Sequence, residues 1–367
     1  MKKISRIIFF FVFVCMLTSS RILADDIDFK DDRKMDVDIP REVDEYFPFS
    51  FDDMDASAIQ NAFDFRFFSE TGVKILVEAI PDGAKSFALL LGLFLITAVL
   101  HTIKGTLAVP ALQTAMDLVS MVCMASAIFG VTETAFGFAE SYIVSLSSFM
   151  KSITPTMAAF LAASGNLTSA SVISGVIFLA VSFLESLVAG VLFPLIRLSL
   201  CVSVVASVFQ ISGIGGIAPY IRKIISYIFG FVTLCLSAVL MFQSMIAKST
   251  DSLAMRGIKF AIGNFVPFVG GAVNEALSTV VGGLGTIKAT TGVVGAVVVC
   301  LLAAVPLIRI LVHKMFLELL SFIASLLGLN TEMRLMTEFS AFLGYTAAIM
   351  AISSVFFILS LSMMAST

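Results

Sequence analysis

The chain has 367 residues, of which 59% are hydrophobic and 13% charged, with a formal net charge of −3 at pH 7. A soluble domain carries about 25% charged residues, so this composition argues against a soluble protein, and two histidines exclude a His-rich metal site. Apolar runs of about 18 or more residues recur from Ser86 to the C-terminus, which is the pattern of membrane-spanning helices. We therefore expect an all-α polytopic integral membrane protein.

Residues 1–24 have the layout of a secretory signal peptide. A basic start precedes the apolar run Ile7–Leu17, small polar residues follow, and Ala24 stands before Asp25. The sequence predicts cleavage after Ala24, with a retained membrane anchor as the alternative.

Residues 25–85 are expected to form an exported acidic arm. Residues 25–70 contain 15 acidic and 5 basic residues, whereas the rest of the mature chain contains 11 acidic and 14 basic residues. Apolar periodicity is weak before Phe47, so we expect partial disorder, with a short amphipathic helix over 56–81. The arm either docks on a partner or serves only as a solvating leader.

Residues 86–367 are expected to form a multi-pass membrane domain with about 6–8 transmembrane helices. The firm spans are Ser86–Ile103, Asp117–Phe138, Ser171–Phe193, Ile224–Ile246, a fifth that opens with Gly292–Val305, and Glu338–Met363. Four apolar pieces remain open between full spans, re-entrant helices and interfacial helices: Ile143–Ala163, Leu195–Ile211, Phe260–Leu284 and Leu307–Leu329.

A repeated tetrapeptide, Pro-Leu-Ile-Arg, occurs at residues 194–197 and 306–309, which is an offset of 112 residues. Two further pairs share this offset: Pro155 with Pro267, and Arg222 with Arg334. We interpret the offset as an internal duplication, with repeats at about 117–228 and 229–362. If each repeat holds an even number of crossings, the two copies have the same orientation in the membrane.

The basic residues suggest a sidedness. An exported N-terminus makes the first span run inward and places Lys104 in the cytoplasm. If the four open pieces do not cross, the basic residues expected inside are Arg197, Arg222, Lys223, Arg309, Lys314 and Arg334, and those expected outside are Lys151, Lys248, Arg256, Lys259 and Lys288.

Prolines and glycines within the apolar runs predict kinks or hinges, because proline removes a helical hydrogen bond. The candidates are Pro155, Pro194, Pro267, Pro306, Gly270 and Gly271. After Pro194 and Pro306 an arginine follows three residues later, so Arg197, Arg309 and His313 are candidates for an interfacial arm along the membrane surface. Such an arm either anchors the adjacent spans or acts as a mobile gate or partner contact.

Polar residues inside the membrane are the candidate pore or structural positions. Glu185 lies in the middle of an apolar run, where a carboxylate must pair, become protonated or face water. Residues 251–285 read as a broken or re-entrant element that lines a cavity, with tight helix packing as the alternative. The candidates are Glu185, Glu275, Asn274, Asp251, Arg256, Lys259 and Asn264.

Catalytic motifs are missing from the sequence. It has no GxxxxGK[ST] loop, no GxSxG and no paired zinc ligands, and its cysteines stand singly. We expect no enzyme activity, no cofactor, no metal site and no nucleic-acid partner.

The stretch TDSLAMRGIKFAIGNFVPFVGGAVNEA, residues 250–276, resembles the signature region of the stage III sporulation protein AE family of endospore-forming Firmicutes. The likeness is most specific at Asp251, Arg256, Lys259, Phe260, Gly263, Asn264, Pro267, Gly270, Gly271 and Pro306. The export signal, the acidic leader and the apolar remainder are also similar to the layout of that family.

The resemblance implies a multi-pass protein of the mother-cell membrane around the forespore. Its implied partners are other proteins of the stage III sporulation A operon, namely a cytoplasmic ATPase, ring-forming proteins and membrane subunits, together with a forespore-side partner. It implies a sporulation-specific secretion-like channel complex that supports forespore development. A stand-alone transporter of small solutes or ions, and a purely structural anchor of the complex, are the alternatives.

Overall fold

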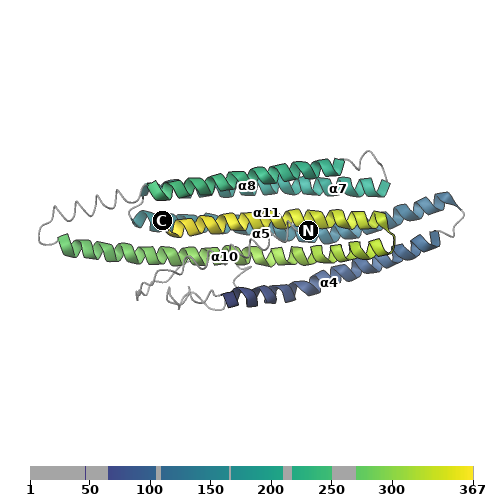
Figure 1. The fold of residues 1–367 in the computed structure, drawn as a ribbon, viewed down its shortest axis with the longest axis horizontal. Helices are drawn as coiled ribbons and strands as arrows, with labels where there is room; N and C mark the ends of the chain where they lie inside the picture. The colour runs from purple at the N-terminus through teal and green to yellow at the C-terminus, as the bar shows by residue number, and fades with distance from the viewer. Residues whose placement is uncertain are drawn as a thin grey trace.

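The computed structural model describes Tyr46 and residues 65–104, 109–164, 167–209, 217–249 and 270–366. In this part of the chain the long helices lie side by side along one axis, with α11 between α8 and α10 (Figure 1). The helices are α4 (Phe65–Lys104), α5 (Pro110–Ala163), α6 (Leu167–Leu187), a π-helical turn (Val188–Leu192), α7 (Phe193–Phe209), α8 (Ile217–Ser249), α10 (Gly270–Leu326) and α11 (Asn330–Ser366).

Six helices of the described part are long and apolar enough to cross a membrane. Their candidate spans are 66–104, 110–163, 169–206, 220–246, 288–326 and 330–365. The expected all-α polytopic architecture is thereby confirmed.

The apolar pieces that the sequence left open extend neighbouring spans into longer helices. Residues 143–163 are the second half of α5, residues 195–209 lie in α7, which follows α6 through the π-helical turn, and residues 307–326 end α10. Of residues 260–284, those from Gly270 onward belong to α10. The helix continues through Pro155 in α5 and Pro306 in α10. Pro194 is the second residue of α7, just after the π-helical turn, where the backbone is already widened.

The helix ends follow from local sequence. Pro110 occupies the first turn of α5 after the extended residue Val109, a position where the missing proline N–H costs nothing. Gly328 links α10 to α11 with φ of 73°, a left-handed conformation that glycine adopts without strain. The amide of Leu329 then donates to the carbonyl of Ala324 at 3.1 Å, which closes the turn.

The directions of the helices alternate. Gly292 of α10 lies beside Ala365 of α11, while Lys314 bonds Ser340, so these two helices are antiparallel. Helix α8 is parallel to α11, because Arg222 bonds Glu338 and Gln243 bonds Ser360 at separations of 116 and 117 residues. Parallel packing is compatible with the duplication at offset 112, which stays a prediction.

The core lies around the α10–α11 hairpin. In the most apolar windows of these helices 61% and 67% of the residues are buried, against 17% in α4 and α8. Large aromatic side chains that are fully buried fill the interior: Phe94, Phe136, Phe193, Phe339, Phe342 and Phe357. The described bundle is therefore packed solid by apolar groups rather than built around a lumen.

Candidate functional site

Charged residues that the sequence distributes among apolar runs meet in one layer of the bundle. Arg197 of α7 donates to Glu133 of α5 at 2.8 Å and pairs with Glu140 of α5 at 3.0 Å. Phe138 lies between these two glutamates in the sequence. The guanidinium of Arg309 from α10 packs over its ring, with 5.2 Å between the guanidinium carbon and the ring centre. These contacts place α5, α7 and α10 at one level.

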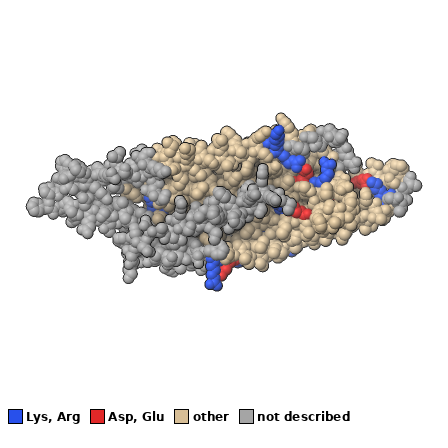
Figure 2. Space-filling view, in the orientation of Figure 1, with Lys and Arg blue, Asp and Glu red and all other residues tan. Residues whose placement is uncertain are grey.

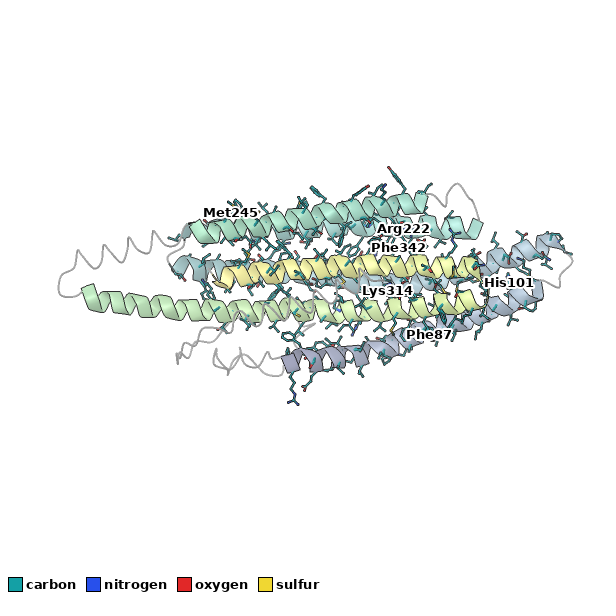
Figure 3. All side chains as sticks on the ribbon, in the orientation of Figure 1. Phe87, His101, Arg222, Met245, Lys314 and Phe342 are labelled. Carbon is teal, nitrogen blue, oxygen red and sulfur yellow. The ribbon has the colours of Figure 1, made fainter. Side chains whose placement is uncertain are left out.

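The same layer continues through α10, α11 and α8. Lys314 of α10 pairs with Glu318 and donates to Ser340 of α11 at 2.9 Å. Two residues before Ser340, Glu338 accepts a hydrogen bond of 2.5 Å from Arg222 of α8. In Figure 3 Lys314 and Arg222 lie at nearly the same position along the bundle axis.

We call this layer the charged belt and define it as Glu133, Glu140, Arg197, Arg222, Arg309, Lys314, Glu318 and Glu338. Its four cations and four anions balance. Four of the six arginines and lysines that the sequence groups on one side of the membrane lie in it. In Figure 2 the charged groups form small clusters on a described surface that is otherwise uncharged.

The belt is only partly enclosed. The side chains of Arg197 and Glu133 are 36% and 44% exposed, and those of Arg222 and Glu338 are 24% and 26% exposed. Glu133 Oε2 and the hydroxyls of Ser199 and Ser203 are buried without a hydrogen-bond partner. Partly exposed ion pairs contribute little net stability, so the belt is better explained by position, as a polar layer where charges can reach water or headgroups.

On one side of the belt the helices run without charge for about the thickness of a bilayer. Residues 289–308 of α10, 224–247 of α8 and 339–366 of α11 contain no charged residue. About 20 helical residues span about 30 Å, the thickness of the hydrocarbon core. We call this section the apolar layer.

Helix α4 does not place its apolar run in the apolar layer. Its first half carries the exposed pair Arg66 and Glu70, and its apolar run 86–103 lies at and beyond the belt, since Phe87 stacks on Phe316 of α10 at 5.1 Å. Lys104 pairs with Asp117 of α5 near the far end of this hairpin. The first span predicted from sequence therefore sits at and beyond the belt, together with the second predicted span, residues 117–138 of α5, which ends among the belt residues.

An ion pair interrupts the apolar layer between α5 and α6. Lys151 of α5 donates to Glu185 of α6 at 2.7 Å, and the Ser147 hydroxyl donates to the same carboxylate oxygen at 2.5 Å. The Lys151 and Glu185 side chains are 39% and 35% exposed. Four exposed serines neighbour the pair on the two helices: Ser148, Ser152, Ser182 and Ser186.

We call Ser147, Ser148, Lys151, Ser152, Ser182, Glu185 and Ser186 the polar patch. Lys151 lies 11 residues from Glu140 of the belt, or about 16 Å along α5. The polar patch is thus near the middle of the apolar layer. The sequence identified Glu185 as an anomaly but did not identify its partner, because Lys151 is 34 residues away.

The expected interfacial arm has a different environment. Its residues belong to α7 and α10 and lie at belt level within the bundle, because both helices continue straight out of their spans. His313 is only 5% exposed, its Nδ1 lies 2.8 Å from the Arg309 carbonyl oxygen, and it lines a cavity of about 10 Å³ between α4 and α10, with room for one water molecule. The three residues therefore take part in the helix packing of the described bundle, and the interfacial arm stays a prediction.

Other predicted site residues fall outside the described positions. Asp251, Arg256, Lys259, Asn264 and Pro267 lie in residues 250–269, which the structure does not describe. Gly270 and Gly271 begin α10, and the side chains of Asn274 and Glu275 on its first turns are also outside the described part. Their roles stay predictions. Among the described residues, no group of three or more histidine, cysteine, aspartate or glutamate side chains could hold a metal ion.

Comparison with known proteins now identifies the family. The sequence model of the family "Stage III sporulation protein AE" matches residues 50–367. The "Stage III sporulation protein AE" of Bacillus subtilis (strain 168) is 30% identical over 229 residues, which are 62% of this chain and 57% of that relative. No solved structure shows a significant match. Because the family match covers most of the chain, the protein belongs to the stage III sporulation protein AE family.

Proposed function

We propose that the protein is a membrane subunit of a sporulation-specific, secretion-like channel complex that links mother cell and forespore. It is placed in the mother-cell membrane around the forespore, with its N-terminal arm extracytoplasmic after removal of the signal peptide. The observation that carries the proposal is the family match over residues 50–367, since the family is one of stage III sporulation. The six span-length helices of the described part supply the membrane character that such a subunit needs.

The proposal assigns no catalytic step to this chain. The energy for transport comes from a partner, which we take to be the ATPase of the stage III sporulation A operon, and the ring-forming proteins contact the extracytoplasmic arm. The ion pairs and polar contacts of the charged belt join α5, α7, α8, α10 and α11 at one level. That arrangement suits a rigid scaffold or wall for a membrane passage.

The arm provides the first test. We expect a variant that lacks residues 25–64 but keeps the signal peptide to insert in the membrane, to fail to co-purify with the ring-forming proteins, and to block forespore development in the native host. The deletion ends before α4, so every described helix is kept, and the described contacts that it removes are those of Tyr46, whose hydroxyl donates to Glu78 at 2.9 Å and whose ring lies under Lys74. Normal co-purification and normal spore yield would contradict the proposal.

A stand-alone transporter is the second candidate, and the polar patch is the observation that favours it. Glu185→Gln removes the carboxylate charge with little change in shape. Loss of solute flux in vesicles that contain only this chain, with an intact complex in cells, would favour the transporter. Unchanged behaviour of vesicles together with loss of complex function would favour the channel subunit.

A further inference from the structure

We infer that the polar patch on the outer face of α5 and α6 faces water inside the membrane, and that it lines an aqueous path whose opposite wall is made by further copies of this chain. The inference rests on the proposed function, because it names the surface that forms the passage. It differs in kind from a passage through the centre of one chain.

The ion pair of the polar patch is exposed at the depth of the membrane. The Lys151 and Glu185 side chains are 39% and 35% exposed on the bundle surface, near the middle of a layer that is otherwise uncharged on α8, α10 and α11. Charged side chains at this depth face a bundle interior or a water-filled space, because exposure to hydrocarbon is costly. Lipid is therefore a poor neighbour for this face.

The outer face of α5 and α6 differs from the outer face of α8 at a similar depth. On α8 the exposed residues at this level are bulky and apolar, with Met241 69%, Phe242 48% and Met245 60% exposed. On α5 and α6 the exposed residues around the ion pair include four serines of the polar patch, Ser148, Ser152, Ser182 and Ser186, beside Val144 and Phe183, which are 60% and 39% exposed. The α8 face suits lipid chains, whereas the hydroxyls of the α5–α6 face suit water.

The filled interior of the described bundle limits where the aqueous path can run. In the described bundle the interior is filled by fully buried aromatic side chains such as Phe136, Phe193 and Phe342, which come from α5, α7 and α11. A water-filled path along the axis of these helices has no room. A hydrated outer face must instead be shielded from lipid by another protein surface.

Further copies of this chain suit the protein surface that faces the polar patch. The polar patch carries one lysine and one glutamate that neutralise each other at 2.7 Å. Copies arranged around a shared path would therefore place no net charge at the centre of the membrane and would not repel one another. The small serine side chains also leave space between neighbouring copies.

The test uses single cysteines in a background where Cys15, Cys123, Cys201, Cys235 and Cys300 are replaced by serine or alanine. Ser148→Cys and Ser186→Cys report on the polar patch, and Met241→Cys on α8, where the side chain is 69% exposed, is the matched control. Met241 is level with the patch, because Gln243 of α8 bonds Ser360 of α11, and the next residue, Leu361, meets Ile153 of α5 beside Gly295. Membranes of the native host are treated with a charged, hydrophilic methanethiosulfonate reagent, which modifies thiols in contact with water.

We expect the two patch cysteines to react at least 10-fold faster than the cysteine at 241. Equal rates would overturn the inference. Slow reaction combined with spontaneous disulfides between patch cysteines of two copies would also overturn it, because the face would then be a dry contact. Serine to cysteine is nearly isosteric, so folding is preserved.

A second measurement tests the copies. Two differently tagged versions of the chain are expected to co-purify from the same membranes, and recovery of single copies alone would overturn the shared path. The proposed function and the hydrated polar patch can fail or hold independently of each other. Fast patch reaction without binding of operon partners would leave the hydrated face standing, whereas partner binding with an unreactive patch would leave a channel subunit whose path runs elsewhere.

Discussion

Arg222 and Glu338 show what a single interhelical ion pair contributes in this bundle. The two side chains join α8 to α11 and are 24% and 26% exposed, so removal of one leaves a half-buried charge without its partner. We expect Arg222→Leu or Glu338→Leu alone to lower stability by about 1–2 kcal/mol, and the double variant to lose less than the sum. Thermal unfolding in detergent measures this.

The control pair is Arg66 and Glu70 at the start of α4. Their side chains are 83% and 67% exposed, so Arg66→Leu is expected to leave the unfolding temperature unchanged. Strictly additive losses in the Arg222 and Glu338 variants would show that the two side chains are not coupled.

The residues of the site could be predicted in part. Glu185 and Arg197 were visible in the sequence because a charge inside an apolar run stands out. Their partners were not predictable, because Lys151 and Glu133 belong to another helix, 34 and 64 residues away. A pairwise contact of this range depends on how helices pack, which local hydropathy does not encode.

At the scale of elements, the α10–α11 hairpin depends on a close approach at Gly292. A methyl group added there would overlap the Cβ of Ala365. We expect Gly292→Ala to lower stability by about 1–3 kcal/mol through overpacking, and Ala365→Gly to restore much of it in the double variant. Unfolding temperatures in detergent provide the measurement.

Gly175 of α6 is the matched control for this substitution. Nothing lies within 4 Å of a Cβ added at Gly175, so Gly175→Ala is expected to be neutral or to stabilise slightly through helix propensity. Equal destabilisation at both positions would contradict a close α10–α11 approach at Gly292.

Gly328 sets the turn between the same two helices. Its φ of 73° is costly for residues with a Cβ, so Gly328→Ala is expected to lower stability by about 1 kcal/mol. Asn tolerates this conformation better than Ala, and Gly328→Asn is therefore expected to lose less. The reverse order, measured by thermal unfolding, would exclude a left-handed turn at this residue.

At the scale of the whole molecule, the alternating helix directions predict which helix ends share a side of the membrane. Cysteines at Val109, Ile217 and Leu327, which are 54%, 47% and 51% exposed, are expected to be modified by an impermeant reagent from one side. Leu167 and a tag after Thr367 are expected on the other side. Opposite locations for Ile217 and Leu327 would rule out the parallel packing of α8 and α11, and with it the same-way-up duplication.

The lengths of the helices have a second consequence at this scale. Helix α5 has 54 residues and α10 has 57, or about 80 Å each, which is more than twice the hydrocarbon thickness. The section of α4 and α5 beyond the belt exposes further apolar residues, among them Ile96 and Val99 on α4 and Val119 on α5. A single bilayer cannot cover both apolar sections of so long a bundle.

The sequence by itself determined the class of this protein: helical, membrane-embedded and a member of its sporulation family. Those properties follow from hydropathy over about 20 residues and from a local signature, both of which are written along the chain. Only the tertiary structure decided that separate apolar pieces join into continuous helices, that Arg222 meets Glu338 across 116 residues, and that Lys151 and Glu185 form a polar patch on the outer surface. The reason is that helix packing sets these contacts: it depends on the shapes and directions of whole helices, which no local window contains.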